Sequence, residues 1–322
     1  MRLAILDDYH DLAFKMADWS QLQDVSVVSY SDHVDDVDRL VDRLSEFDAV
    51  MRIRERTHFP RSVLRRLPRL KLLLATGMRN ARSINLEAAH ELGITVCTTD
   101  AIHATTVEIT WAFILGLFRR VHQEAASLRA GGWQRELGAG LDGKTLGVLG
   151  LGNMGIPVAR IGQAFGMKVI AWSPNLTPER AAEHQVECVA KADLFRRSDA
   201  VTIHVPQVDA TIGIVSADDI ARMKPGAFLV NTSRSQLVDQ EALIDALVHG
   251  RIAGAGIDVF DIEPLPLNHP YRWLPSVLAT PHIGFVTEEN FRIFFSQSFE
   301  NIQAWLKGEP IRVVKGLSDT WR

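Results

Sequence analysis

Three stretches in the C-terminal half of the chain carry residues that could bind an anion and move a proton. Arg234 stands in VNTSRSQLVD, Asp258 and Glu263 in GIDVFDIEPLP, and His282 in TPHIG. A guanidinium can pair with a carboxylate through two hydrogen bonds, and a histidine beside a carboxylate can act as a general acid or base. Taken alone, each could be a solvated arginine, part of a turn or a core histidine. Together, each beyond a strand, they indicate one site.

The stretch TLGVLGLGNMG indicates where a dinucleotide would bind. An apolar strand at 145–149 leads into Gly150-x-Gly152-x-x-Gly155, and a helical pattern follows. Gly150 permits the tight turn, Gly152 lets the backbone approach a pyrophosphate, and Gly155 lets helix and strand pack closely. A glycine-rich packing turn is the alternative, but the strand–turn–helix context favours a dinucleotide site.

The next strand, at 168–172, ends without the expected acid. Its continuation is SPNLTPER, with Ser173 where a carboxylate usually binds the adenosine ribose. Ser173 can hydrogen-bond a ribose hydroxyl or a 2′-phosphate and repels neither. Asn175 can donate hydrogen bonds nearby, and Arg180 follows at a distance that depends on the loop. We therefore expect NAD(P), with a slight preference for NADP.

Short apolar runs alternate with amphipathic helical segments along the whole chain, which predicts α/β domains with parallel sheets. The expected strands are 2–6, 25–30, 48–51, 70–75, 94–97, 145–149, 168–172, 200–204, 227–231, 252–258 and 277–280. The first expected helices are 12–18, 36–44, 61–66 and 85–91, followed by one long helical stretch at 104–130 and a final helix at about 287–306.

A length of 322 residues predicts two domains. The late stretch EPIRVVKG has the pattern of an edge strand with no partner left in the second half, so we assign it to the first. We therefore expect one discontinuous domain, residues 1–100 and 287–322. A dinucleotide-binding Rossmann domain, residues 101–286, is inserted into it.

The composition is that of an ordinary globular enzyme, 47% apolar and 23% charged. A net charge of −4 gives no reason to expect nucleic acid or an anionic membrane as a partner. No segment fits a signal peptide or a spanning helix. The two cysteines, Cys97 and Cys188, fit a reducing compartment rather than a disulfide framework. We expect a cytoplasmic protein that needs no metal.

GLGNMG, VNTSRSQLVDQEAL, GIDVFDIEPLP and TPHIG resemble the D-2-hydroxyacid dehydrogenase family of D-isomer-specific NAD(P) oxidoreductases. The resemblance implies a flavodoxin-like substrate-binding domain with a doubly wound NAD(P)-binding domain inserted into it. It also implies a homodimer, for which the helical stretch at 104–130 is the expected contact. The implied reaction is hydride transfer between NAD(P)H and a small 2-keto acid, such as glyoxylate, hydroxypyruvate or a 3-phosphoglycerate-like compound. An NAD(P)-sensing corepressor or binding protein on the same fold is the alternative.

The resemblance implies a role for each chemical residue. Arg234 binds the substrate carboxylate and polarises the keto oxygen, His282 is the acid/base, Glu263 orients His282 and favours its protonated form, and Asp258 orients the nicotinamide carboxamide. Ser235 stands where the family usually has glycine, which narrows the backbone freedom beside Arg234. The expected cofactor-binding residues are Gly150, Gly152, Asn153, Met154, Gly155, Ser173, Thr232 and Asp258.

The loop ATGMRNA, residues 75–81, corresponds to the substrate-facing loop of the family. The expected substrate-binding residues are Thr76, Gly77, Met78, Arg79 and Arg234. Met78, Arg79 and Asn80 replace the usual small residues, and their size gives no support for formate or phosphite oxidation. Arg79 is either an extra anion contact or a solvated arginine. Arg52 and Arg54 follow another strand in a comparable position, so a bulky or acidic substrate stays open.

Overall fold

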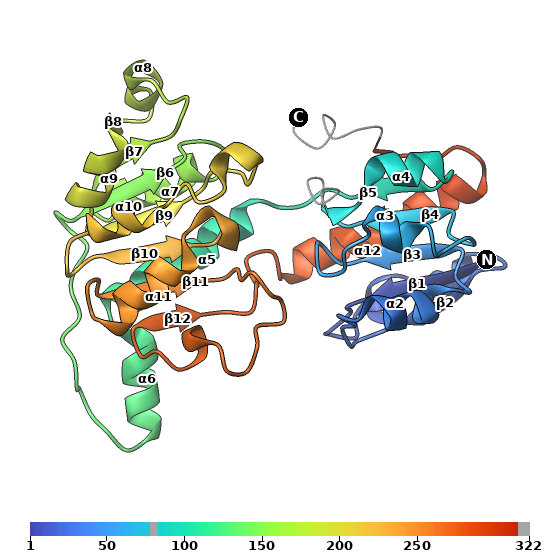
Figure 1. Ribbon diagram of the computed structural model, residues 1–322, viewed down its shortest axis with the longest axis horizontal. Helices are drawn as coiled ribbons and strands as arrows, with labels where there is room; N and C mark the ends of the chain where they lie inside the picture. Colours follow the sequence, from blue (N-terminus) through green and yellow to red (C-terminus); the bar gives the residue numbers. More distant parts are fainter. Residues whose placement is uncertain (78–82, 315–322) are drawn as a thin grey trace. The chain divides into compact units, whose positions relative to one another are not determined.

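The computed structural model describes residues 1–77 and 83–314, and the chain divides into two compact units. Unit 1 is Met1–Ile102 with Thr287–Arg322, and unit 2 is His103–Val286 (Figure 1). The chain leaves unit 1 once and returns once, so unit 2 is an insertion. Each unit is a parallel sheet with helices on its faces, which confirms the predicted α/β class with two Rossmann-like domains.

Unit 1 is built on a five-stranded parallel sheet of order β2-β1-β3-β4-β5. This is the flavodoxin-like order. The strands are β1 (Arg2–Leu6), β2 (Ser26–Ser29), β3 (Ala49–Arg52), β4 (Leu72–Ala75) and β5 (Thr95–Thr98). The helices are α1 (Ala13–Met16), α2 (Val37–Leu44), α3 (Arg61–Leu64), α4 (Leu86–Glu91) and α12 (Glu288–Leu306).

Successive side chains of a strand point to opposite faces of the sheet, and every residue of β3 and β4 is buried, so both faces of this sheet are covered. Leu6, Val50 and Leu73 belong to a core that also contains the apolar residues of α2, α3 and α4. Figure 1 shows these three helices in front of the sheet and α12 behind it. Asn301 of α12 donates a hydrogen bond to the carbonyl oxygen of Thr98 at 2.8 Å, so the returning segment is fastened to β5.

The tail after α12 pairs with the free edge of β5. Val313 forms an antiparallel bridge with Cys97, and the Val314 amide donates to the Val96 carbonyl oxygen at 2.8 Å. The Thr98 amide in turn donates to the carbonyl oxygen of Arg312 at 3.0 Å. These bonds occupy donors and acceptors that an edge strand would otherwise leave open.

Unit 2 is built on a seven-stranded parallel sheet of order β12-β11-β10-β9-β6-β7-β8. The strands are β6 (Thr145–Leu149), β7 (Lys168–Trp172), β8 (Glu187–Cys188), β9 (Ala200–Ile203), β10 (Phe228–Asn231), β11 (Gly254–Ile257) and β12 (Val277–Ala279). The helices are α5 (Ala104–Phe118), α6 (Val121–Arg129), α7 (Gly155–Ala164), α8 (Pro178–Ala182), α9 (Lys191–Arg197), α10 (Ala217–Ala221) and α11 (Gln240–Val248).

The helices of unit 2 lie on both faces of its sheet. Val148 and Val230 share a core with the apolar residues of α5 and α7, whereas Ile203 and Leu229 share a second core with those of α9, α10 and α11. The strand order reverses between β6 and β9, because β7 and β8 extend to one side and β10 to β12 to the other. Open α/β sheets bind ligands at such a reversal, beyond the carboxyl ends of the strands.

The single helical stretch expected at 104–130 is wrong. Two helices, α5 and α6, meet at Arg120, which has a left-handed backbone (φ 54°) and so interrupts the helix. The physical reason is a change in burial. Apolar residues of α5 such as Phe113, Ile114 and Leu117 are buried against the sheet, whereas none of the residues of α6 is buried.

No helix in the described part of the chain is long and apolar enough to cross a membrane.

A buried carboxylate joins three loops at the carboxyl edge of the unit 1 sheet. Asp7, directly after β1, has a left-handed backbone (φ 59°) and is almost fully buried. Its carboxylate lies 2.7 Å from Nδ1 of His33 and accepts a hydrogen bond from Oγ1 of Thr57 at 2.6 Å. The hydrogen bond to Asp7 raises the pKa of His33 against the opposing effect of burial, and Asp35 adds to the rise.

The raised pKa of His33 predicts how the stability of unit 1 depends on pH. A histidine whose pKa is higher in the folded state stabilises that state fully below its unfolded pKa, about 6.5. The stabilisation is lost as the pH rises through the folded value. We expect the free energy of unfolding to fall as the pH rises above about 6.5, and His33→Asn to flatten this fall. Urea denaturation at several pH values measures both. His249→Asn, on an exposed histidine of unit 2, is the matched control, and an equal slope in wild type and His33→Asn would contradict the assignment.

Candidate active site

The chemical residues expected in unit 2 all lie beyond the carboxyl ends of neighbouring strands. Arg234 comes three residues after β10, Asp258 directly follows β11, and His282 comes three residues after β12. These strands are adjacent and parallel, so their carboxyl ends share one edge of the sheet (Figure 1). The glycine turn after β6 and Ser173 after β7 lie along the same edge.

His282 and Glu263 form a hydrogen-bonded pair. Nδ1 of His282 lies 2.7 Å from Oε2 of Glu263, and the other carboxylate oxygen accepts the Phe260 amide at 3.0 Å. The two side chains are only 15% and 28% exposed, so the pair is shielded without being sealed from a ligand. A carboxylate accepts the Nδ1 proton, which leaves Nε2 of the ring as the atom that can exchange a proton with a ligand.

Asp258 holds the turn that carries His282. Its carboxylate accepts three hydrogen bonds: from Oγ1 of Thr280 at 2.5 Å and from the amides of Ile283 and Gly284 at 2.8 Å each. His282 itself has a left-handed backbone (φ 52°), which a non-glycine residue rarely adopts. Burial raises the pKa of Asp258, and the hydrogen bonds from the turn act in the opposite direction.

The residues around Arg234 form a tight turn. Arg234 is partly buried, and its Nη1 donates to the carbonyl oxygen of Ser233 at 2.7 Å. Ser235 opens the short 3₁₀ helix η4 (Ser235–Leu237), so the backbone there needs no glycine. Thr232 is 6% exposed, and its Oγ1 lies 2.8 Å from Oγ1 of Thr110 in α5.

The glycine turn fits a dinucleotide. Gly150 has a φ of 101°, and a Cβ on it would lie 2.8 Å from the backbone of His204. A Cβ on Gly155 would lie 1.9 Å from the Gly150 carbonyl oxygen, whereas one on Gly152 would meet no atom of the described residues within 4 Å. The turn is therefore tightly packed on one side and open at Gly152. Helix α7 begins at Gly155, and its N-cap residue, Met154, makes no side-chain hydrogen bond to the first amides of the helix. An anion site at a helix N-terminus requires that these amides have no such cap.

The turn after β7, which begins with Ser173, is contacted by Arg180. The Leu176 amide donates to the Ser173 carbonyl oxygen at 3.1 Å, which closes the turn. Nη1 of Arg180 donates to the Asn175 carbonyl oxygen at 3.2 Å. The guanidinium therefore lies against the turn that begins with Ser173, a placement that the sequence left open.

His204 is a residue at this edge that the sequence analysis missed. It directly follows β9, between the glycine turn and the turn of Arg234, and its Nε2 lies 2.9 Å from Oγ1 of Thr202. Burial lowers the pKa of His204 to about 4, so its ring is neutral near pH 7. The stretch VTIHVP carries the same signal as TPHIG, a histidine beyond an apolar strand.

In unit 1, two of the expected substrate residues follow β4. Thr76 is fully buried, and its Oγ1 accepts the Arg54 amide at 2.8 Å. Gly77 has a φ of 84°, and its amide donates to Oγ1 of Thr99 at 2.9 Å. Met78 and Arg79 lie outside the described residues, as does Asn80.

Arg52 is the last residue of β3 and Arg54 lies two residues beyond it, but their side chains differ in burial and in contacts. Arg52 is fully buried, and Nη1 donates to the carbonyl oxygen of Thr57 at 3.0 Å and to Oγ of Ser83. Burial lowers the pKa of Arg52 to about 10. Arg54 has a left-handed backbone (φ 56°), and its Nε lies 3.5 Å from Oε2 of Glu55. Arg52 therefore supports the loop after β3, and only Arg54 is partly accessible.

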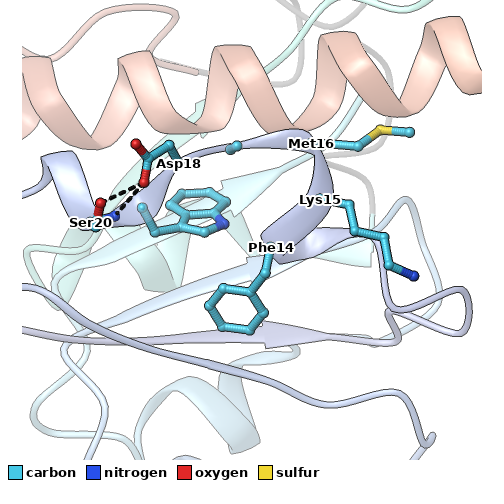
Figure 2. A pocket seen from close by; sticks show the side chains of 7 residues that line it. Phe14, Lys15, Met16, Asp18 and Ser20 are labelled. Carbon is cyan, nitrogen blue, oxygen red and sulfur yellow. Dashed lines mark hydrogen bonds between the residues drawn. The ribbon is translucent and has the colours of Figure 1, made fainter.

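A surface hollow on unit 1 contains none of the expected site residues. It is lined by residues 14–20, in α1 and the segment after it. Figure 2 shows the Asp18 carboxylate turned towards Ser20, whose amide and hydroxyl it accepts at 3.2 and 2.5 Å. The Asp18 carboxylate thus caps a 3₁₀ turn. Within residues 1–77 and 83–314, no three His, Cys, Asp or Glu side chains gather as metal ligands.

Comparison with known proteins decides the family. The model of the D-isomer specific 2-hydroxyacid dehydrogenase NAD-binding domain matches residues 111–284. The chain belongs to this family. The resemblance of its motifs is thereby confirmed, as is a dinucleotide-binding unit for NAD(P). The glyoxylate reductase of Aeropyrum pernix is 39% identical over 259 residues, which cover 77% of this chain and 76% of that protein.

Two further relatives extend the match to both units. The D-3-phosphoglycerate dehydrogenase of Methanocaldococcus jannaschii is 34% identical over 313 residues, 96% of this chain but only 58% of that longer protein. The crystal structure of a phosphoglycerate oxidoreductase from Vibrio cholerae superposes with a TM-score of 0.90 at 35% identity, covering 96% of this chain and 99% of the other. Members of the family thus match the chain from unit 1 to unit 2.

Proposed function

We propose that this chain is an NAD(P)-dependent reductase of small 2-keto acids that forms D-2-hydroxy acids. The observation that carries the proposal is the His282–Glu263 pair, which lies at the same sheet edge as Arg234 and the glycine turn. The names of the relatives agree with it, because glyoxylate is a 2-keto acid and 3-phosphoglycerate is a 2-hydroxy acid. Unit 2 would bind NAD(P), and unit 1 would contribute the substrate contacts Thr76, Gly77, Met78 and Arg79.

Each side chain has a distinct task in this reaction. Arg234 pairs with the substrate carboxylate and polarises the keto group. When bound, NAD(P)H supplies the hydride that reduces the carbonyl carbon. His282 gives the proton on Nε2 to the carbonyl oxygen, because Nδ1 is engaged by Glu263. Glu263 keeps the ring in that orientation.

Asp258 would orient the nicotinamide carboxamide. A carboxylate offers about four acceptor positions, and three are used by Thr280, Ile283 and Gly284. One position is left for the carboxamide NH₂. The cofactor set that we propose is the glycine turn with Asn153 and Met154, then Ser173, Thr232 and Asp258.

The first prediction of this function concerns His282. The wild-type protein should oxidise NADH or NADPH with members of a panel of 2-keto acids. His282→Asn should lower kcat by about two to four powers of ten, the usual range for losing a general acid. Cofactor binding, measured by quenching of protein fluorescence, should stay unchanged. His249→Asn, on an exposed histidine in the C-cap of α11, is the control. Cofactor binding without turnover of any 2-keto acid would instead favour a sensor or corepressor.

The second prediction concerns the cofactor's 2′-phosphate. Ser173 carries no charge that would repel it, and the guanidinium of Arg180 lies on the same turn. We expect use of both cofactors with a modest preference for NADPH. Ser173→Asp should shift the ratio of kcat/KM values towards NADH by about ten- to a hundredfold through like-charge repulsion.

Two arginine variants separate the 2′-phosphate contact from a general charge effect. Arg180→Met should reduce kcat/KM for NADPH only, whereas Arg196→Met, on an exposed arginine of α9, should leave the ratio unchanged. A strict requirement for NADH in the wild type would refute the assignment of Ser173.

We also propose that the enzyme is a homodimer joined through α6 and the segment after it. Val121 and Leu128 of α6 are 55% and 60% exposed, and Trp133 and Leu137 beyond it are 76% and 97% exposed. A concentration of exposed large apolar side chains is typical of an interaction surface. Sedimentation equilibrium should give twice the chain mass, and Leu128→Glu should weaken the dimer without unfolding the chain. A wild-type monomer at micromolar concentration would exclude this interface.

A further inference from the structure

The turn that carries Arg234 is closed by one side chain, that of Asn231. Asn231 is the last residue of β10 and is 2% exposed. Its Oδ1 accepts the Ser233 amide at 3.0 Å, and its Nδ2 donates to the carbonyl oxygen of Arg234 at 2.8 Å. The amide thus satisfies one donor and one acceptor of the backbone just after the strand ends. Neither the motif nor the chemistry of the reaction assigns a role to Asn231.

Helix α5 holds the same turn through a chain of two hydroxyl groups. Oγ1 of Thr110 can donate to the Thr106 carbonyl oxygen at 2.8 Å. Oγ1 of Thr110 also lies 2.8 Å from Oγ1 of Thr232, a hydrogen bond in which either hydroxyl can donate. Thr110 is fully buried, so this contact is protected from water. A third bond, from Oγ of Ser233 to the Val205 carbonyl oxygen at 2.9 Å, ties the turn to the end of β9.

The geometry of this turn sets the position of the guanidinium. Nη1 of Arg234 donates to the carbonyl oxygen of Ser233, which is part of the turn itself. A shift of the turn therefore moves the charged group. Catalytic and binding groups must be held within about 0.5 Å of their productive position, and a misplacement of about 1 Å can cost about a hundredfold in rate.

We propose that Asn231 is a positioning residue that places the guanidinium of Arg234, with Thr110 of α5 supporting the same turn. This inference rests on the proposed function, since it assigns to Asn231 an effect on the binding of a 2-keto acid. Aspartate has the same shape but cannot donate to the Arg234 carbonyl oxygen. Its carboxylate would instead place two acceptors against each other.

The test is Asn231→Asp in the full-length protein. We expect kcat/KM for the best 2-keto acid to fall about ten- to a hundredfold, with KM rising, because the contact to the substrate carboxylate is displaced. The dissociation constant for NAD(P)H, measured by fluorescence, should change by less than about threefold. Asn301→Asp is the matched control, because Asn301 is also fully buried and also donates to a carbonyl oxygen, that of Thr98 in unit 1. It should leave kcat/KM unchanged per folded molecule.

A double variant separates positioning from general damage to the fold. If Asn231 acts through Arg234, then Asn231→Asp should have little further effect in an Arg234→Lys background, because the two-pronged contact is already lost. If Asn231→Asp does not fold, Thr110→Val and Thr110→Ser decide. The valine variant should lower kcat/KM, and the serine variant, which keeps the hydroxyl, should restore most of it.

Each remaining outcome counts against a stated claim. Three results would overturn the role of Asn231 and leave the proposed reaction standing. They are a wild-type kcat/KM in Asn231→Asp, a fully additive loss with Arg234→Lys, and a parallel loss of cofactor affinity. A wild-type protein that turns over no 2-keto acid would overturn the proposed function, and this inference with it.

Discussion

The hydrogen bonds to the Asp258 carboxylate are the interaction on which the candidate site depends. They join the end of β11 to the turn after β12 and hold His282 in a left-handed conformation. A buried carboxylate without partners would carry a large desolvation cost. Here hydrogen bonds from two backbone amides and one hydroxyl offset that cost. In return, the two amides, which have no strand partner, receive a hydrogen-bond acceptor. Asp258 and Glu263 therefore fix His282 from two sides, one through its backbone and one through its ring.

A polar side chain that hydrogen-bonds the backbone of a loop recurs along the carboxyl edge of the unit 2 sheet. Each loop that carries a chemical group is fastened by a polar side chain at or just beyond the end of a strand, Asn231 for the loop of Arg234 and Asp258 for that of His282. Where the loop must instead leave backbone amides open, at Gly152 and the start of α7, glycine replaces the polar side chain. Rigid loops suit groups that act on a small substrate, and an open backbone suits a pyrophosphate.

At the carboxyl edge of the unit 1 sheet, buried charged side chains hold a loop in place. Arg52 and Asp7 are both buried, and both hydrogen-bond to the loop after β3, through the carbonyl oxygen and the hydroxyl of Thr57 respectively. Arg54, whose amide is held by Thr76, and Arg56 are both partly accessible in that loop. The loop after β3 is thus held by a framework of buried polar bonds.

The sequence by itself determined the features that depend on local patterns. The glycine spacing at 150–155, the alternation of strands and helices, and the positions of Arg234, Glu263 and His282 beyond strands follow from backbone sterics and side-chain periodicity. Only the tertiary structure decided which groups meet. Several features depend on turn geometry or on partners far along the chain. They are the break at Arg120, the burial of Arg52, the contact of Arg180 with Asn175, and the bond between Thr110 and Thr232. Such contacts leave no local pattern, because the free energy that selects them comes from packing and hydrogen bonding in the folded state.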